Sequence, residues 1–362
     1  MSSRPLRFLG IAVMAVSAPF ARAEVTKSLR AHLAGAASRE FAVENLLGTM
    51  RVTAGSEDDV VVEATIHAAS DELASAVRLE EVRGEHGVPT LRVRYPAIRR
   101  TLRYYDPDDR HDDWPGFLVF GNSGDIRYDG RKYRVSARHG ELLYADVEVR
   151  VPPRLAAATF MNLAGRLEAE GLQGKLSFRV DSANLRLARL RGEVDAAGSS
   201  GDTRALEIAG SWRSDFSSGD CEVSRLEGPS ATFRTSSGDV RARSIVADRV
   251  SVQTSSGDYS FQDADVHEIQ TESSSGDLAI DCRGNRLERV RVESSSGDVR
   301  LALPGDASFH AEADQSSGDM RVGFDDGRRG YRRDELVSFR RGTGGADIRV
   351  STSSGDFTIV PR

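Results

Sequence analysis

Lysine, cysteine, proline and tryptophan are all scarce in this chain. Of its 49 basic residues only three are lysines, Lys27, Lys132 and Lys175, and no basic run forms a stripe. Together with a formal net charge of −6, this argues against a nucleic-acid partner. The 11 prolines and 34 glycines fit neither a collagen repeat nor a proline-rich linker. After residue 23 no apolar run approaches the ~18 residues of a transmembrane helix, so no membrane span is expected there.

The first 23 residues have the pattern of a secretory signal peptide. Arg4 and Arg7 precede an apolar run from Phe8 to Ala18, and Ala21 and Ala23 frame an Ala-x-Ala cleavage site. We therefore expect an exported protein, located in the periplasm, on the cell surface or outside the cell. No cysteine directly follows the cleavage site, so a lipid anchor is not expected.

A Ser-Gly-Asp triplet recurs through the chain, and its spacing is nearly constant. From Asp202 onward the steps are 18, 19, 19, 19, 21, 21 and 37 residues, and the last step contains a charged insert, Asp325 to Asp334. The triplets end at Asp125, Asp202, Asp220, Asp239, Asp258, Asp277, Asp298, Asp319 and Asp356.

The sequence on both sides of each triplet alternates between apolar and polar residues. Val250 and Val252 precede Asp258, and Tyr259 and Phe261 follow it, with the same spacing as in the other units. This is the pattern of strand, turn and strand, with one face buried. A unit of about 19 residues cannot bury its apolar face alone, but stacked copies can. We therefore predict an all-β fold, a parallel β-helix or β-solenoid with rungs of about 18–21 residues.

Other repeat folds fit less well. A β-propeller blade needs about 40 residues, and the Leu-x-x-Leu-x-Leu pattern of leucine-rich repeats is missing. The repeat pattern of strand, turn and strand continues upstream in less regular form, with Asn184 and Arg166 in the position of the motif aspartate. The segment from Glu44 to Arg51 is a further, degenerate copy of the repeat.

We divide the chain into three parts. Residues 1–23 are the signal peptide, residues 24–150 an irregular N-terminal β region, and residues 151–362 the repeat solenoid. The N-terminal region would form early rungs or a cap, with an insert at 96–116. Strands are expected within 41–66, 88–95 and 142–151, and a short helix at 70–77. The final rung ends near Arg362, which predicts an open strand edge available for docking.

The two cysteines are not expected to form a disulfide, although export would favour one. The turns next to Cys221 and Cys282 are three rungs apart, or about 14 Å. A disulfide requires Cα atoms within about 7 Å of each other. Cys221 is instead predicted to be a small, inward-facing core residue.

The repeated aspartates are the first candidate site. In tight turns Asp and Ser accept backbone N–H bonds and Gly supplies a positive φ, which makes a structural role the leading interpretation. Stacked carboxylates would also repel one another, and weak calcium binding would relieve this. The residues concerned are Asp202, Asp220, Asp239, Asp258, Asp277, Asp298, Asp319 and Asp356.

A polar loop around residues 104–114 is the second candidate. Tyr104, Tyr105 and Trp114 could stack on sugar rings or contact a protein partner, or they could cap the core. The loop is also rich in potential oxygen ligands for a divalent cation, although solvation alone explains such a composition. These residues are Asp106, Asp108, Asp109, His111, Asp112 and Asp113.

The sequence contains no recognisable catalytic or cofactor motif. The seven histidines lie outside any Gly-x-Ser-x-Gly or His-Glu-x-x-His pattern, and no phosphate-binding glycine loop follows a strand. We therefore expect no enzymatic activity, no catalytic or metal-ligating residues, and no cofactor.

With these features the chain resembles the bacterial DUF4097 family, whose members carry tandem Ser-Ser-Gly-Asp-type β repeats and are labelled adhesins. The resemblance rests on the triplet ladder, on Glu44 to Met50, and on Val147 to Pro152, and it spans about residues 40–362. It implies a β-solenoid and supplies no catalytic residues.

The expected function is a structural or adhesive module of the cell envelope, whose rigid face contacts a glycan or a protein. One alternative is an accessory or sensory protein of an envelope-stress system that acts through a membrane partner. A polysaccharide lyase or hydrolase is a further alternative, suggested by fold analogy alone.

Overall fold

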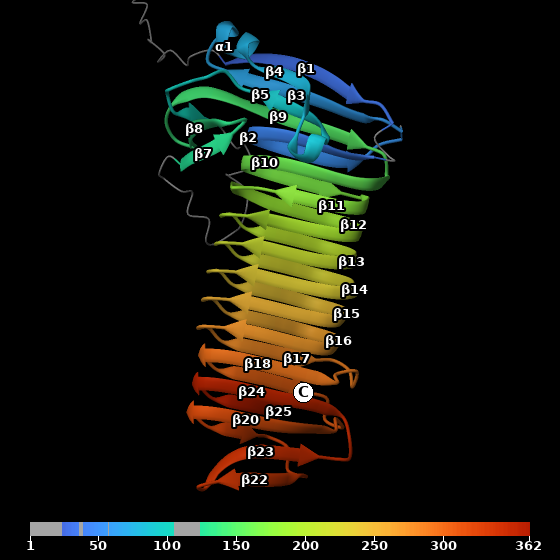
Figure 1. Ribbon diagram of the computed structural model, residues 1–362, viewed down its shortest axis with the longest axis vertical. Coiled ribbons are helices and arrows are strands. Elements are labelled where there is room, and N and C mark those ends of the chain that lie inside the picture. The colour runs from blue at the N-terminus through green and yellow to red at the C-terminus, as the bar shows by residue number, and fades with distance from the viewer. Residues whose placement is uncertain (1–23, 36–38, 57, 105–123) are drawn as a thin grey trace, which may run out of the picture.

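The chain forms a long rod with a broader head at its N-terminal end (Figure 1). The computed structural model describes residues 24–35, 39–56, 58–104 and 124–362, so the expected signal peptide lies outside the described residues. The rod is a parallel β-solenoid, which confirms the fold predicted from the repeats. Within the described ranges, no helix is long and apolar enough to cross a membrane.

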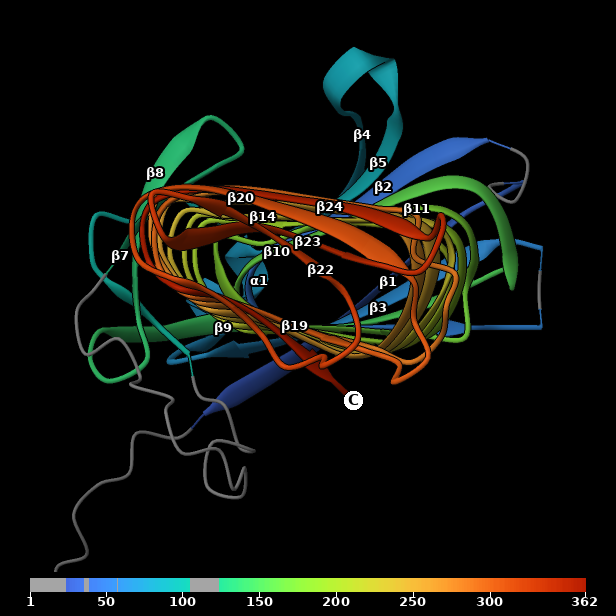
Figure 2. The ribbon, with the colours of Figure 1, turned by 90° about the horizontal axis from the view of Figure 1, so that it is seen from below.

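The middle of the rod consists of long strands that pair in parallel with their neighbours. Val240 lies opposite Cys221 on one side and Tyr259 on the other, a shift of one repeat in each direction. Seen along the axis, the strands form a flattened coil (Figure 2). The strands are β10 (Arg154–Glu170), β11 (Gln173–Arg179), β12 (Ser182–Gly198), β13 (Thr203–Phe216), β14 (Cys221–Thr235), β15 (Val240–Thr254) and β16 (Tyr259–Ser273).

The core consists of columns of apolar side chains from equivalent repeat positions. Val250 and Val252 before the turn, and Tyr259 and Phe261 after it, are all buried, as their alternation predicted. Phe261 also packs edge-on against Phe233 of the preceding rung, with ring centroids 5.8 Å apart. Since each such side chain stabilises the fold by about 1.5–3 kcal/mol, the stacked columns hold the rungs together.

The decayed repeats belong to the same ladder. Strand β2 (Glu40–Ala54) pairs with β10 so that Gly48 lies opposite Gly165 and Thr49 opposite Arg166. One rung further, Arg166 lies opposite Asn184. These pairings confirm the upstream extension of the repeat pattern.

The triplet that ends at Asp125 is an exception. Its Gly124 and Asp125 lie in β7 (Gly124–Tyr128), which forms an antiparallel hairpin with β8 (Arg131–Ser136) away from the ladder. Its carboxylate pairs with Lys132 and Arg134 instead of with a stacked turn. The triplet alone therefore does not identify a rung, because the flanking alternation is also required.

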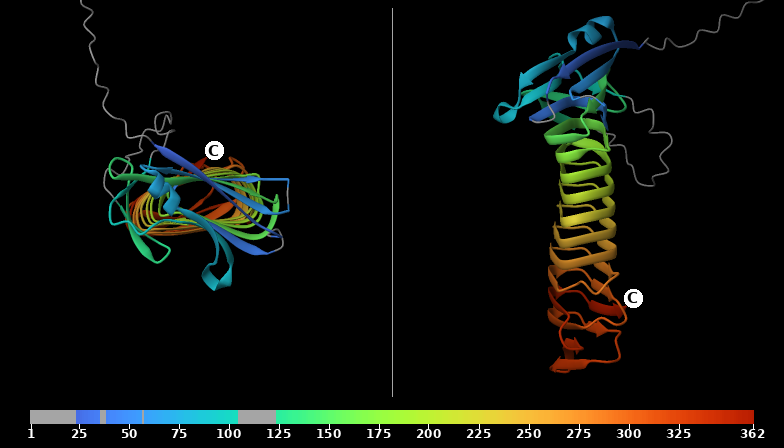
Figure 3. Two further views of the ribbon diagram at one scale, coloured as in Figure 1. Left: turned by 90° about the horizontal axis from the view of Figure 1, so that it is seen from above. Right: turned by 90° about the vertical axis from the view of Figure 1, so that its right-hand side faces the viewer.

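The head closes the upper end of the rod (Figure 3). Strand β9 (Glu141–Val151) pairs in parallel with β2 but antiparallel to β3 (Val60–Ala68), and β3 pairs antiparallel with β1 (Val25–Leu33). This switch to antiparallel pairing ends the solenoid and confirms that the N-terminal part is less regular and forms a cap. The remaining elements are α1 (Asp71–Ala76), β4 (Arg78–Arg83), a 3₁₀ turn (Glu85–Gly87), β5 (Pro89–Arg94) and β6 (Leu102–Arg103).

The short helix begins as predicted. The hydroxyl of Ser70 accepts a hydrogen bond from the backbone N–H of Leu73, at 3.3 Å, and so caps α1. The expected strands at 41–66, 88–95 and 142–151 correspond to β2 and β3, β5, and β9.

The C-terminal rungs are not stacked in chain order. Strands β24 and β25 lie between the pair β18–β19 and the pair β20–β21, although they follow both pairs in the sequence. The expectation of an open edge at the last strand is therefore wrong, because the final strands are paired on both sides. The elements of this end are β17 (Leu278–Cys282), β18 (Arg289–Ser296), β19 (Val299–Leu303), β20 (Phe309–Ser317), β21 (Met320–Val322), β22 (Arg328–Arg332), β23 (Glu335–Arg341), β24 (Ala346–Ser354) and β25 (Phe357–Pro361).

Both cysteines are free and buried. Burial raises the pKa of the Cys221 thiol to about 12, and it does the same for Cys282. The prediction that Cys221 is an inward-facing core residue is thus confirmed.

Candidate functional site

The stacked Ser-Ser-Gly-Asp turns form one edge of the rod, and their glycines are required for two reasons. Gly257 has φ +122°, a region that residues with a Cβ rarely adopt. A Cβ at this position would lie 2.2 Å from the carbonyl oxygen of Gly238 in the preceding rung. Glycine therefore allows both the turn and the close stacking of successive turns.

The motif aspartates form a continuous hydrogen-bonded ladder. Each Oδ1 accepts the backbone N–H of the aspartate in the next rung, as Asp258 does from Asp277 at 2.9 Å. The ladder starts at Asn184, whose Oδ1 accepts the N–H of Asp202. It then continues through Asp220, Asp239, Asp258, Asp277, Asp298, Asp356 and Asp319.

Arginines reduce the charge of the ladder at two places. Arg241 contacts Asp220 at 3.1 Å and Asp239 at 2.6 Å. Arg321 bridges Asp319 and Asp356 in the same way. Among the described residues no group of three or more His, Cys, Asp or Glu side chains is placed to hold a metal ion.

The two serines of each motif have different roles. The second serine donates its hydroxyl hydrogen bond to the preceding rung, as Ser256 does to the carbonyl oxygen of Ser236 at 3.3 Å. The first serine is exposed, and among the described residues its hydroxyl makes no hydrogen bond. We call these first serines the free serine row: Ser217, Ser236, Ser255, Ser274 and Ser295.

A groove runs beside the free serine row along the axis of the rod. Its volume is about 690 Å³, and its lining comes from six successive rungs. At five steps of about 4.8 Å, the groove extends for about 24 Å. The residues two positions before the first serine of each motif line it, and we call them the groove row: Asp215, Arg234, Gln253, Glu272, Glu293 and Ser351.

The groove row is linked by hydrogen bonds between rungs. Arg234 donates to Gln253 at 2.7 Å, and Gln253 donates to Glu272 at 3.0 Å. With three carboxylates and one guanidinium, the row has a formal charge of −2. No sequence motif identifies this row. Its members differ chemically, so only their shared distance from the motif aspartate would have revealed them.

The predicted aromatic site is only partly within the described residues. Tyr104 is partly buried and packs against the core, and its backbone N–H bonds the carbonyl of Ser136. Tyr105, Trp114 and the acidic loop from Asp106 to Asp113 lie outside the described residues.

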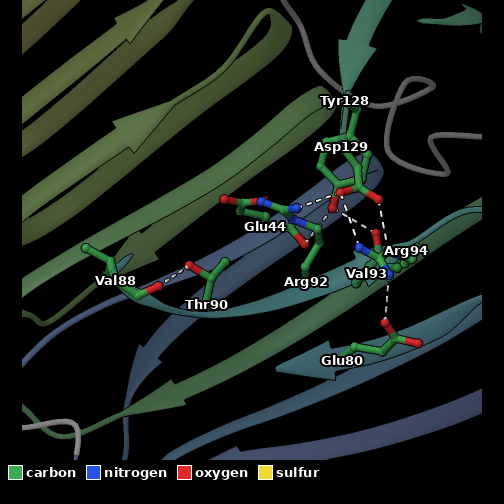
Figure 4. Close-up of polar contacts among 9 residues, drawn as sticks. All are labelled: Glu44, Glu80, Val88, Thr90, Arg92, Val93, Arg94, Tyr128 and Asp129. Atoms are coloured by element: carbon green, nitrogen blue, oxygen red, sulfur yellow. Dashed lines mark hydrogen bonds and ion pairs between the residues drawn. The ribbon is translucent and has the colours of Figure 1, made fainter. Parts of the chain in front are cut away.

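The head contains a cluster of charged residues that no sequence motif indicates (Figure 4). Arg92 contacts Glu44 at 2.5 Å and Asp129 at 2.6 Å, while Arg94 contacts Asp129 at 2.9 Å and Glu80 at 3.1 Å. Burial alone would raise the pKa of Asp129, but its hydrogen bonds and proximity to the two arginines lower it. The cluster joins β2, β4 and β5 to the β7–β8 hairpin, so it fixes the shape of the head.

Comparisons with known proteins found similar solved structures and one family model. Solved structures similar to this chain include a candidate cell adhesion protein from Clostridium sporogenes, with 8% identity, TM-score 0.22, and coverage of 93% of this chain and 100% of that one. Two others are from Parabacteroides distasonis. One is a candidate lipid binding protein, with 11% identity, TM-score 0.38, and coverage of 93% and 96%. The other is a candidate adhesin, with 10% identity, TM-score 0.36, and coverage of 92% and 97%.

No curated protein matches the sequence. The family model described as Toastrack DUF4097 matches residues 176–360, which include all the regular triplets. This range is shorter than the 40–362 expected from the motifs, although β2 is structurally part of the ladder. Since the match covers half of the chain, the protein belongs to the DUF4097 family.

Proposed function

We propose that this protein is an exported, non-enzymatic module of the cell envelope that binds an extended glycan along its groove. The observation that carries the proposal is the free serine row, because its hydroxyls are exposed and unused within the fold. A polymer that follows the groove could contact one such hydroxyl per rung over about 24 Å.

The chemistry of the groove favours a neutral or amino-substituted glycan. Serine hydroxyls can donate to and accept from sugar hydroxyls, and Glu272 and Glu293 accept from them. The charge of −2 on the groove row would repel an anionic polymer. Because no exposed aromatic ring among the described residues lines the groove, affinity for a single sugar would be weak, and binding would depend on many contacts along one chain.

The test uses the full-length protein with insoluble neutral, amino-substituted and anionic polysaccharides. Retention on each polymer and release of soluble sugar are measured in the same tubes. We expect retention on the neutral or amino-substituted polymer, little on the anionic one, and no sugar release.

A triple variant, Ser236→Ala, Ser255→Ala and Ser274→Ala, removes three hydroxyls of the free serine row. If each contributes about 1 kcal/mol, binding should weaken by about 100-fold. The matched control is Ser224→Ala, Ser251→Ala and Ser260→Ala, which removes three hydroxyls outside the groove. Equal retention by the two triple variants would contradict the proposed site.

The sugar-release measurement tests the enzymatic alternative. Glu272 and Glu293 are direct neighbours in the parallel register, so two carboxylates lie about one rung apart beside the groove. Such a separation resembles that of the two carboxylates in retaining glycosidases. Sugar release that persists after repurification and disappears in Glu272→Gln would show that the protein hydrolyses the glycan, and it would overturn the proposed binding function.

A further inference from the structure

The lower end of the rod carries an arginine-rich hairpin that has no role in the proposed glycan groove (Figures 1 and 3). Strands β22 and β23 pair antiparallel there, and β23 attaches the hairpin to β20. Residues 328–341 contain six arginines and two acids, a formal charge of +4. Since the whole chain carries −6, the remaining residues carry −10.

The hairpin is anchored by one side while its other side remains exposed. Phe339 is buried and packs against Phe309, with ring centroids 5.6 Å apart. Arg341 is held by Asp326 at 2.7 Å and by the carbonyl of Ala307. The base of the hairpin is therefore rigid.

Three arginines project from this base. Arg328, Arg333 and Arg340 are exposed and form no ion pair among the described residues. Arg328 lies directly opposite Arg340 in the antiparallel register, so both side chains are on the face opposite to Phe339. Like charges placed directly opposite each other destabilise a strand pair in the absence of an anion.

The tip of the hairpin has a second unfavourable feature. Arg333 and Asp334 connect the paired residues Arg332 and Glu335, with φ of 49° and 71°. Two successive positive φ values define a type I′ turn, in which Asn-Gly is strongly preferred over residues such as arginine. The chain thus keeps an arginine at its outermost point against local preference. The same left-handed backbone occurs at Arg189 and Arg225 of the rod, so the contribution of this turn is to hold the Arg333 side chain at the end of the hairpin.

We propose that this hairpin docks the rod end-on onto an anionic lipid bilayer. Arg328, Arg333 and Arg340 would contact lipid phosphates. Tyr331, which is 60% exposed beside them, would lie at the level of the headgroups. The negative charge of the rest of the chain opposes side-on contact with the same surface, which orients the rod. This proposal does not depend on the glycan groove.

Co-sedimentation with vesicles tests the proposal. The exported form, residues 24–362, is mixed with phosphatidylcholine vesicles that either contain or lack phosphatidylglycerol. We expect binding only to the anionic vesicles, weakening as salt increases. The variant Arg328→Gln, Arg333→Gln and Arg340→Gln should bind about 100-fold more weakly, given the contribution of each arginine near a charged membrane.

The control variant is Arg243→Gln, Arg291→Gln and Arg300→Gln. It removes the same charge from exposed arginines along the rod, and it should bind nearly as well as the wild type. Every variant begins at residue 24, because the apolar run of residues 8–18 would itself bind vesicles of either composition. Equal losses in both triple variants, or equal binding to neutral vesicles, would overturn the proposal.

Two further measurements distinguish a lipid bilayer from other anionic ligands, and a loss of membrane contacts from a loss of folding. Inorganic phosphate at matched ionic strength should not displace the protein from vesicles, and displacement by phosphate would overturn the bilayer assignment. A hairpin variant that loses binding to a soluble polyanion but still binds anionic vesicles like the wild type would overturn it as well. Arg333→Asn introduces a residue that suits the turn. It should leave thermal stability unchanged or higher and weaken vesicle binding by about 5-fold, a combination that a purely structural arginine would not produce.

Discussion

The repeated aspartate acts mainly through one oxygen atom. Its Oδ1 accepts a backbone N–H from the next rung, and Asn184 provides the same acceptor at the start of this ladder. An amide oxygen is therefore sufficient for the contact. The negative charge of the other aspartates is not needed for stacking and must instead be neutralised or solvated.

Substitution of one ladder residue separates these two contributions. Asp258→Asn retains the acceptor for the N–H of Asp277, so the free energy of unfolding should change by less than about 0.5 kcal/mol. Asp258→Ala leaves that N–H without its partner and should destabilise the protein by about 1–2 kcal/mol. Urea denaturation measures both. If Asn were as destabilising as Ala, the charge itself, or a bound cation, would be essential.

The turn glycines allow a second comparison at the level of single residues. Gly257→Ala combines an unfavourable positive φ with overlap of backbone atoms, so it should destabilise the protein by about 3 kcal/mol or more. Gly130, with φ +70°, has no atom of the described residues within 4 Å of the position that a Cβ would occupy, so Gly130→Ala should cost only about 1 kcal/mol. Similar losses in thermal or urea unfolding would show that φ alone dominates.

At the level of strands, the repeat pattern predicted the solenoid but not the order of its last rungs. The core positions around Asp319 and Asp356 are similar, with Ala311 and Met320 in one unit and Ile348 and Phe357 in the other. Either unit could stack on Val290 and Val299, so periodicity cannot distinguish the two orders. The long insert between the units gives β24 and β25 enough chain to return to the inner position.

The candidate site was predictable only in part. The aspartate ladder follows from the triplet, because every copy is identical. The groove follows from position alone, since Arg234, Gln253 and Glu272 share no chemical type that a motif could identify. The charged cluster of the head joins Glu44, Arg92 and Asp129 from distant parts of the chain, which no local pattern reveals.

Because β24 and β25 are internal, their removal should be far more harmful than removal of the hairpin. A chain that ends at Gly345 loses the buried side chains of Ile348, Val350, Phe357 and Ile359 and uncovers both neighbouring rungs. At about 1.5–3 kcal/mol for each side chain, the loss is of the order of 6–12 kcal/mol. Limited proteolysis should then digest the chain from β18 onward.

The comparison for this truncation is a chain in which a short linker replaces residues 326–341. It keeps every parallel rung and should resist proteolysis from β18 to β25. Equal sensitivity of the two shortened chains would mean that the hairpin, and not the internal rung, secures this end.

At the scale of the whole molecule, the rod is a series of contacts between neighbouring rungs, with no covalent link between Cys221 and Cys282. Stability in such an architecture depends on nearest-neighbour interfaces, and opening begins at the ends. Cys282 lies in the short strand β17, near the rearranged end, whereas Cys221 lies among the long strands of the middle.

The two thiols can therefore report where the rod opens. With burial raising the pKa of each thiol to about 12, neither should react with a disulfide reagent at pH 8 while its rung is closed. In increasing urea we expect Cys282 to react before Cys221, as measured with the single-thiol variants Cys221→Ser and Cys282→Ser. Identical reaction rates at every urea concentration would instead indicate one cooperative unit.

The uniform register of the middle rungs also means that the number of repeats sets the distance between the two ends of the protein. Head and hairpin are built from different sequences, yet the units between them are interchangeable in backbone geometry. Duplication or loss of one 19-residue unit would move the two ends apart or together by about 4.8 Å and leave both unchanged. Relatives that differ in repeat number could thus bridge gaps of different width with the same two end pieces, because each added repeat lengthens the rod between the head and the hairpin.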